Sequence, residues 1–267
     1  MKGKRESMYK IKAFTLAEVL ITIGIIGLVA ALTFPSIIGY YQKKVLKEQF
    51  KVAYSMFSQL LLKSEVDLGG KAECYYWDVN PYGAVVCAEY DDRGACTRYE
   101  LADGSPLPSN ISGNMTECKV LLNNILSNVE IVAKCEGNAY QKGCIPEYEG
   151  IDTVQQINNP DLTDDEVYAT SAGCGSFRKN AILNDRKVYV FKNGIILIPY
   201  SVSMPLYAID INGKKGPNKW GYDLFTLRIQ SNNFKPLKLD AGSCMKPHKG
   251  GYTTTEMIKN LYSKSSN

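Results

Sequence analysis

The chain opens on a polar stretch that gives way to a long apolar run. From Phe14 to Phe34 the only ionisable side chain is Glu18, and nearly every other residue is Leu, Ile, Val, Ala, Gly or Phe. A helix of this length reaches roughly 30 Å, the thickness of the hydrocarbon layer of a bilayer. The pattern predicts a polar leader over residues 1–13 and a transmembrane helix over residues 14–39. A charge at the bilayer centre costs about 2.5–3.5 kcal/mol, so Glu18 requires a partner.

The same helix is expected to continue past the membrane as an amphipathic segment over residues 40–69. Its apolar residues recur at spacings of three and four, which predicts one buried stripe. The stripe consists of Leu46, Phe50, Ala53, Phe57, Leu60 and Leu61. Pro35 is expected to bend or locally open the helix, because its ring removes a hydrogen bond and crowds the preceding turn. The pair Gly69-Gly70 predicts where the helix ends.

Residues 70–267 form the expected globular domain, and residues 186–229 carry its clearest strand pattern. Alternating apolar residues lie on both sides of Asn193-Gly194, a dipeptide that favours a tight β-hairpin turn. Two further strands are expected over residues 206–211 and 224–229. Four successive strands predict an antiparallel β-meander, with the helix stripe packed against one face. The expected fold class is therefore α+β.

The remaining segments of the domain have weaker patterns. Their expected elements are strands over residues 75–77 and 84–87 and helices over residues 116–133 and 255–262. Residues 136–175 are rich in Gly, Asn, Asp and Pro, and a break is expected at Asn158-Asn159-Pro160. A short helix is expected to begin there near Thr163, because three acidic residues follow it, as is typical of a first helical turn.

The net charge of +4 resides in the leader, which holds five basic residues and one acid before Ala13. The rest of the chain is therefore formally neutral. Positive charge beside a membrane helix marks the cytoplasmic side, which predicts a single-pass protein with a cytoplasmic leader and an extracytoplasmic domain. A neutral domain lacks the basic surface that nucleic acids require, and no nucleic-acid partner is expected.

All of the eight cysteines follow the apolar run. They are Cys74, Cys87, Cys96, Cys118, Cys135, Cys144, Cys174 and Cys244. None forms a Cys-x-x-Cys pair and His248 is the only histidine, so a zinc site has little support. An even number on the extracytoplasmic side predicts disulfide-rich loops, with the connectivity open and Cys135–Cys144 as one local candidate. The alternative is that several cysteines stay reduced and buried.

The motif Ala13-Phe14-Thr15-Leu16-Ala17-Glu18 resembles the processing site of type IV prepilins and type II secretion pseudopilins. The resemblance covers the leader and helix and departs from the family at Ala13, where the family usually has Gly. It implies a pilin-like fold, cleavage by a prepilin peptidase between Ala13 and Phe14, and N-methylation of Phe14. It also implies that Glu18 of one subunit neutralises the new amine of a neighbour during filament assembly.

The expected function is that of a structural subunit of a type II secretion pseudopilus or type IV pilus-like filament in the bacterial inner membrane. The expected partners are other pilin or pseudopilin subunits, the prepilin peptidase and the inner-membrane assembly platform. A minor pilin with an adhesive or DNA-uptake role is the alternative. Two further interpretations of the apolar run are a secretory signal peptide cut near Val29-Ala30-Ala31 and an uncleaved anchor.

Motifs for catalysis or cofactor binding are sparse. The chain has no Gly-x-Ser-x-Gly elbow and no P-loop, so no enzymatic activity is expected. A loop between the last two expected strands places Asp210, Asn212 and Asp223 among turn glycines, as a calcium site would require. It resembles a glycine-rich loop of pseudopilins, some of which hold calcium. The alternative is a tight loop whose polar side chains bond its own backbone, and neighbouring lysines favour that interpretation.

Overall fold

The structure is a computed structural model that describes residues 15–69, 85–90, 96–107, 114–201, 204–230 and 237–262. The leader, Phe14 and the strand expected over residues 75–77 lie outside these ranges. The chain divides into two compact units, residues 1–45 and residues 46–267, and each is described by itself.

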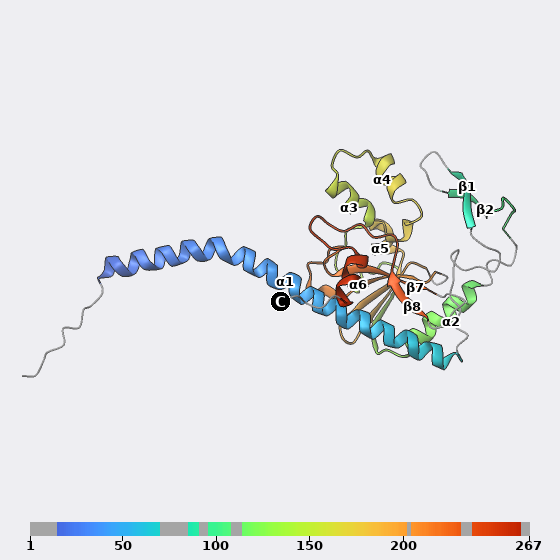
Figure 1. The fold of residues 1–267 in the computed structure, drawn as a ribbon, viewed down its shortest axis with the longest axis horizontal. Helices are drawn as coiled ribbons and strands as arrows, with labels where there is room; N and C mark the ends of the chain where they lie inside the picture. The colour runs from blue at the N-terminus through green and yellow to red at the C-terminus, as the bar shows by residue number, and fades with distance from the viewer. Residues whose placement is uncertain are drawn as a thin grey trace, which may run out of the picture. The chain divides into compact units, whose positions relative to one another are not determined.

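Helix α1 (Leu16–Asp67) is a single helix of 52 residues (Figure 1). The local opening expected at Pro35 is not observed, because the helix is unbroken there. One proline removes one backbone donor, and the hydrogen bonds of the adjoining turns keep the helix continuous. The expected end is confirmed: the chain turns at Leu68 and Gly69, and Gly69 has a φ of 67°.

In the first unit, most of the described apolar side chains of α1 are exposed. Every Leu, Ile, Val and Phe from Leu16 to Phe34 is exposed. The most apolar window of 18 residues has a mean hydropathy of 2.3 and is 0% buried. This helix is long and apolar enough to span a membrane.

The second unit is built on a six-stranded antiparallel sheet in which every strand pairs with its neighbour in the sequence. Its strands are β3 (Ile131–Glu136), β4 (Lys187–Phe191), β5 (Ile196–Pro199), β6 (Leu206–Asp210), β7 (Leu224–Gln230) and β8 (Lys238–Ala241). The expected four-strand meander is confirmed as β4 to β7. Tyr189 pairs with Leu197 across the Asn193-Gly194 turn, and Gly194 has the positive φ of 91° that such a turn favours.

One face of the sheet packs against the predicted stripe of α1. All six stripe residues are buried in one apolar cluster with residues of the sheet. Phe50 lies edge-on to Phe225 of β7, with 4.8 Å between ring centroids. The closing helix is also confirmed as α6 (Thr254–Tyr262), which contacts β8. Lys47 of α1 lies 4.7 Å from the ring centroid of Tyr252, just before α6.

The helix expected over residues 116–133 is wrong at its end. Helix α2 (Asn114–Ser127) stops six residues earlier, and the chain continues as β3. Asn128 is a turn residue whose side-chain amide donates to the carbonyl of Asn124 at 3.0 Å. The β-branched residues that follow pair with β4 instead, with Ile131 opposite Phe191.

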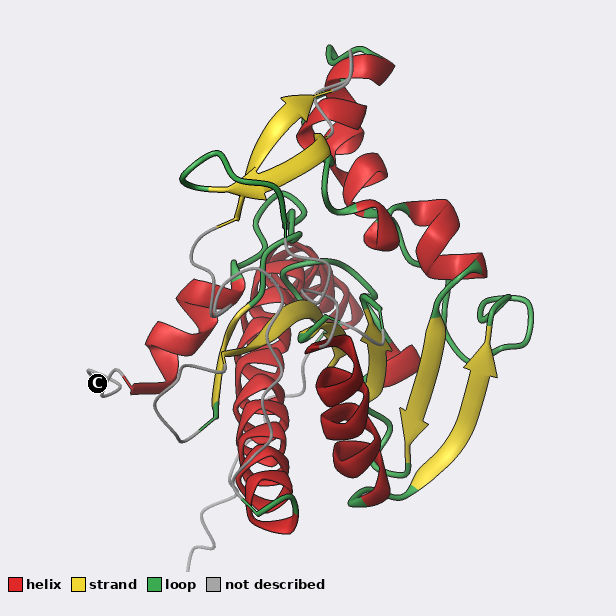
Figure 2. Cartoon of the chain, turned by 90° about the vertical axis from the view of Figure 1, so that its right-hand side faces the viewer, coloured by secondary structure: helices red, strands yellow, loops and turns green. Residues whose placement is uncertain are grey.

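The second face of the sheet is covered by residues 137–186, which we call the β3–β4 connection (Figure 2). It contains α3 (Ile151–Asn158), α4 (Asp164–Thr170), the 3₁₀ turn η2 (Gly175–Phe177) and α5 (Lys179–Asn184). The expected helix after Thr163 is confirmed as α4, whose Thr163 and Glu166 form a reciprocal cap. Helix α3 was not expected, and it forms because Ile151 and Val154 gain burial against the second face. It ends at Asn158, where the break was predicted.

A separate two-stranded sheet pairs β1 (Val85–Tyr90) with β2 (Cys96–Leu101). Strand β1 contains most of the strand expected over residues 84–87, whereas β2 was not expected. The fold class is α+β, with a long apolar N-terminal helix, a C-terminal antiparallel sheet and two described disulfides.

Candidate functional site

The first candidate site lies at the start of α1, where Thr15 and Glu18 cap the helix reciprocally. The backbone amide and the hydroxyl of Thr15 donate to Glu18 Oε2 at 2.9 and 2.8 Å. The amide of Glu18 donates back to the Thr15 hydroxyl at 3.2 Å. This capping box satisfies donors that the first helical turn leaves open, and it directs the carboxylate toward the N-terminal end of the helix.

Ala13 and Phe14, the predicted cleavage pair, lie outside the residues that the structure describes. The sequence nevertheless connects them to this cap, since Phe14 immediately precedes Thr15. Cleavage before Phe14 would place a new amine one residue upstream of the capping box. The sequence singles out Glu18 as a site residue, and the structure adds that Thr15 is its hydrogen-bond partner within the chain.

The second candidate site is the connection between β6 and β7, residues 210–223, which we call the aspartate loop. It contains the 3₁₀ turn η3 (Gly213–Lys215). Asp210 ends β6 and Asp223 precedes β7, and both side chains are 0% exposed. Two buried carboxylates require compensating hydrogen bonds, because an unpaired buried charge is costly.

Donors from the chain provide that compensation. Asp210 Oδ1 accepts from the amides of Asn212 and Gly213 at 3.0 and 2.6 Å. Asp210 Oδ2 accepts from the Tyr148 hydroxyl at 2.7 Å. Asp223 accepts from the amides of Asn218 and Lys219, each at 2.7 Å. Both aspartates therefore act as acceptors that fold the loop around themselves.

Burial is the main cause of the pKa shifts of these groups. It raises the pKa of Asp210 to about 7, and the neighbouring negative charge of Asp223 adds to the shift. Burial also raises the pKa of Asp223 and the pKa of the Tyr148 hydroxyl. These directions follow from placing charge in a low-dielectric interior.

A calcium ion at this loop would need six to eight oxygen ligands. Every carboxylate oxygen of Asp210 and Asp223 already faces an N–H or O–H donor. The side-chain amide of Asn212 donates to the carbonyl of Gly216 at 3.0 Å. Among the described residues no group of three or more His, Cys, Asp and Glu gathers as a metal site would. This arrangement does not fit a calcium ion.

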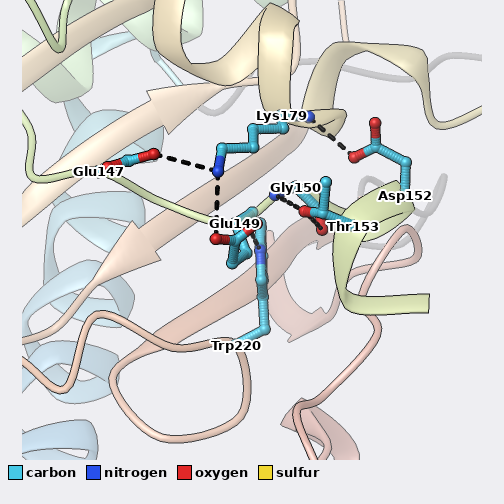
Figure 3. A network of polar contacts seen from close by, with 7 residues as sticks. All are labelled: Glu147, Glu149, Gly150, Asp152, Thr153, Lys179 and Trp220. Atoms are coloured by element: carbon cyan, nitrogen blue, oxygen red, sulfur yellow. Dashed lines mark hydrogen bonds and ion pairs between the residues drawn. The ribbon is translucent and has the colours of Figure 1, made fainter. Parts of the chain in front are cut away.

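The aspartate loop is joined to a polar network of the β3–β4 connection (Figure 3). The indole N–H of Trp220 donates to the carbonyl of Glu149 at 2.7 Å. Lys179 Nζ lies 3.1 Å from Glu147 and 3.2 Å from Glu149. The backbone amide of Lys179 donates to Asp152 at 2.9 Å, which connects the starts of α3 and α5. These contacts fix the connection to the loop and contain no arrangement typical of a catalytic site.

Sequence reasoning missed three residues of this region: Tyr148, Trp220 and His248. Trp220 is fully buried, and its carbonyl accepts from the backbone amide of His248 at 3.0 Å. Burial lowers the pKa of His248. Tyr148 is 62 residues from its partner Asp210, so no local pattern could have paired them.

Five of the eight cysteines have described side chains, and each is in a disulfide. Cys135–Cys144, the predicted local pair, is confirmed, and Cys174 pairs with Cys244 across 70 residues. Cys118 is disulfide-bonded as well. Cys74 and the side chains of Cys87 and Cys96 lie outside the described residues.

A scan of protein-family models, a search of curated proteins and a search of solved structures find no match to this chain.

Proposed function

We propose that this protein is a structural subunit of a type II secretion pseudopilus or a type IV pilus-like filament. It is synthesised as a membrane precursor and cleaved between Ala13 and Phe14 by a prepilin peptidase. It is then N-methylated at Phe14 and assembled through its N-terminal helix. The observation that carries the proposal is Glu18, the only ionisable side chain from Phe14 to Phe34, at the start of an exposed apolar helix.

The chemistry of assembly follows from the pairing of two charges. Cleavage creates an ammonium group at Phe14, next to the capping box that holds the Glu18 carboxylate. A filament interior built from apolar helices would make either charge costly alone. Glu18 Oε2 accepts both Thr15 bonds, and Oε1 would accept from the new amine of a neighbouring subunit. Charge neutralisation between subunits then sets their axial register.

The leader and the disulfides support the proposed location of the protein and the orientation of its domain. The basic leader favours a cytoplasmic N-terminus, and the disulfides favour an oxidising compartment for the domain. Membrane insertion stores the subunit in the inner membrane before assembly. The partners are other subunits of the filament, the prepilin peptidase and the assembly platform.

Assembly is tested by co-expressing the full chain with a prepilin peptidase and filament machinery. Glu18→Gln should insert into the membrane and be processed, but it should be lost from sheared filaments. Glu48→Gln is the matched control, because Glu48 is an exposed acid of α1 paired with Lys51 at 2.9 Å. Normal incorporation of Glu18→Gln into filaments would contradict the proposed role.

Processing is tested separately by mass spectrometry of the mature N-terminus. The expected terminus is Phe14 with one added methyl group, and Ala13→Gly should increase the cleaved fraction or leave it unchanged. An intact leader would identify an uncleaved anchor, and a cut near Ala31 would identify a secretory signal peptide.

A further inference from the structure

We infer that the aspartate loop is a metal-independent structural tie, which holds the β3–β4 connection and the C-terminal segment to the sheet. The hydrogen-bond donors of the chain occupy the positions that a cation would need. This inference concerns the globular unit alone and does not depend on the proposed function.

Several carbonyl oxygens of the loop also accept from donors of the chain. The Lys219 carbonyl accepts from the amides of Tyr222 and Leu224 at 3.1 and 3.2 Å. The Gly221 carbonyl accepts from the amide of Tyr252 at 2.8 Å, and the Asp223 carbonyl accepts from Ile211. A dication at these oxygens would have to displace the amides, and each amide would lose its acceptor.

Two oxygens of the loop are buried without a partner among the described residues, Oδ1 of Asn212 and Oδ1 of Asn218. Two neutral oxygens fall well short of the six to eight that calcium takes. The positive charges of the loop lysines would repel a cation. Lys214 Nζ donates to the carbonyl of Gly143 in the β3–β4 connection, so a lysine side chain joins the two segments.

The loop contacts three segments that are remote in the sequence. In the β3–β4 connection, the Tyr148 hydroxyl donates to Asp210. The carbonyl of Glu149 in the same connection accepts from the indole N–H of Trp220. Gly213 has a φ of 67°, and a Cβ there would collide with the carbonyl of Gly194 in the β4–β5 turn. The loop therefore packs against both the β4–β5 turn and the β3–β4 connection.

The C-terminal segment, residues 244–252, is attached through Gly221. This glycine has a φ of 83°, and a Cβ there would lie 2.7 Å from Pro247 and 2.8 Å from the carbonyl of Tyr252. The Tyr222 hydroxyl donates to the carbonyl of Lys249 at 3.0 Å. These contacts bring the C-terminal segment to the loop without any ligand.

The test uses the full-length protein in detergent. Calcium binding is measured by equilibrium dialysis, and thermal unfolding is compared in millimolar calcium and in EDTA. The inference predicts no saturable binding and the same Tm in both solutions. Asp223→Ala, which leaves the Asn218 and Lys219 amides without acceptors, should lower Tm by at least about 4 °C equally in both. Asp161→Asn, at an exposed acid, is the control and should leave Tm unchanged.

Saturable calcium binding with a rise in Tm that Asp223→Ala abolishes would overturn the inference. Hydrogen exchange tests the tie itself: Asp223→Ala and Gly221→Ala should both accelerate exchange in residues 244–252. Gly221→Ala removes no side-chain oxygen, so its effect cannot arise from a lost metal ligand. Faster exchange confined to residues 211–222 in both variants would show that the loop ties nothing and would also overturn the inference.

Discussion

The hydroxyl of Tyr148 donates to Asp210 at 2.7 Å, and both side chains are fully buried. The two residues are 62 positions apart, one in the β3–β4 connection and the other at the end of β6. This bond joins the β3–β4 connection, which packs on the second face of the sheet, to the meander. A polar bond in the interior contributes mainly because its loss would leave a buried acceptor without a partner.

Tyr148→Phe removes this donor and keeps the ring. We expect the free energy of unfolding to fall by about 1–3 kcal/mol, because Asp210 Oδ2 loses its hydrogen bond in a buried position. Denaturant unfolding of the full-length protein in detergent measures the change. Tyr140→Phe is the control: Tyr140 is 43% exposed, and its change should stay within about 0.5 kcal/mol. Equal effects of the two substitutions would contradict the role given to the buried hydroxyl.

Phe50→Ala is expected to destabilise the globular unit by about 3–5 kcal/mol, because it leaves a cavity between α1 and the sheet. Phe50 is 0% exposed and packs against Phe225 at 4.8 Å. Val52 lies two positions along the same helix and is 66% exposed. Val52→Ala should therefore change stability by less than about 0.5 kcal/mol. Similar losses for the two variants would show that α1 does not pack on the sheet by its predicted stripe.

The two described disulfides should differ in their contribution to stability. Cys174–Cys244 spans 70 residues and Cys135–Cys144 spans 9. On chain-entropy grounds the first contributes about 4 kcal/mol and the second about 2.5 kcal/mol. Paired Cys→Ala variants, unfolded under the same non-reducing conditions, measure both values. A larger loss from removing Cys135–Cys144 would contradict the entropic ordering.

His248 should make part of the stability depend on pH. Burial lowers its pKa in the folded protein, whereas the unfolded chain binds a proton near the ordinary value of 6.5. Its stabilising contribution is therefore complete above about pH 6.5 and is lost as the pH falls through that value toward the lowered pKa. Asp210 acts in the opposite sense, because its raised pKa favours folding as the pH falls.

The comparison of wild type with His248→Gln isolates the histidine from the aspartates, which both proteins retain. As the pH is lowered from neutral through the ordinary histidine range, the Tm of wild type should fall more than the Tm of His248→Gln. A difference that stays constant with pH would show that His248 has the same pKa in the folded and unfolded states.

Local patterns were sufficient where a segment repeats a period or carries a strong turn signal. The spacing of Leu46 to Leu61 predicted the buried face of α1, and Asn193-Gly194 predicted the β4–β5 hairpin. The three acidic residues after Thr163 predicted the start of α4. These signals succeed because the physics involved, amphipathic burial, turn geometry and acids at a helix N-terminus, acts between residues close in the sequence.

The sequence by itself determined the apolar N-terminal run with Glu18 as its only acid, the antiparallel meander and the packing of helix on sheet. Only the tertiary structure decided that residues 137–186 cover the second face, that β3 begins where a helix was expected, and that Tyr148 and Trp220 meet the aspartate loop. Short segments such as α3 lack enough periodic residues to specify a structure alone. Their conformation is chosen by burial and hydrogen bonds with residues tens of positions away, which a local pattern cannot encode.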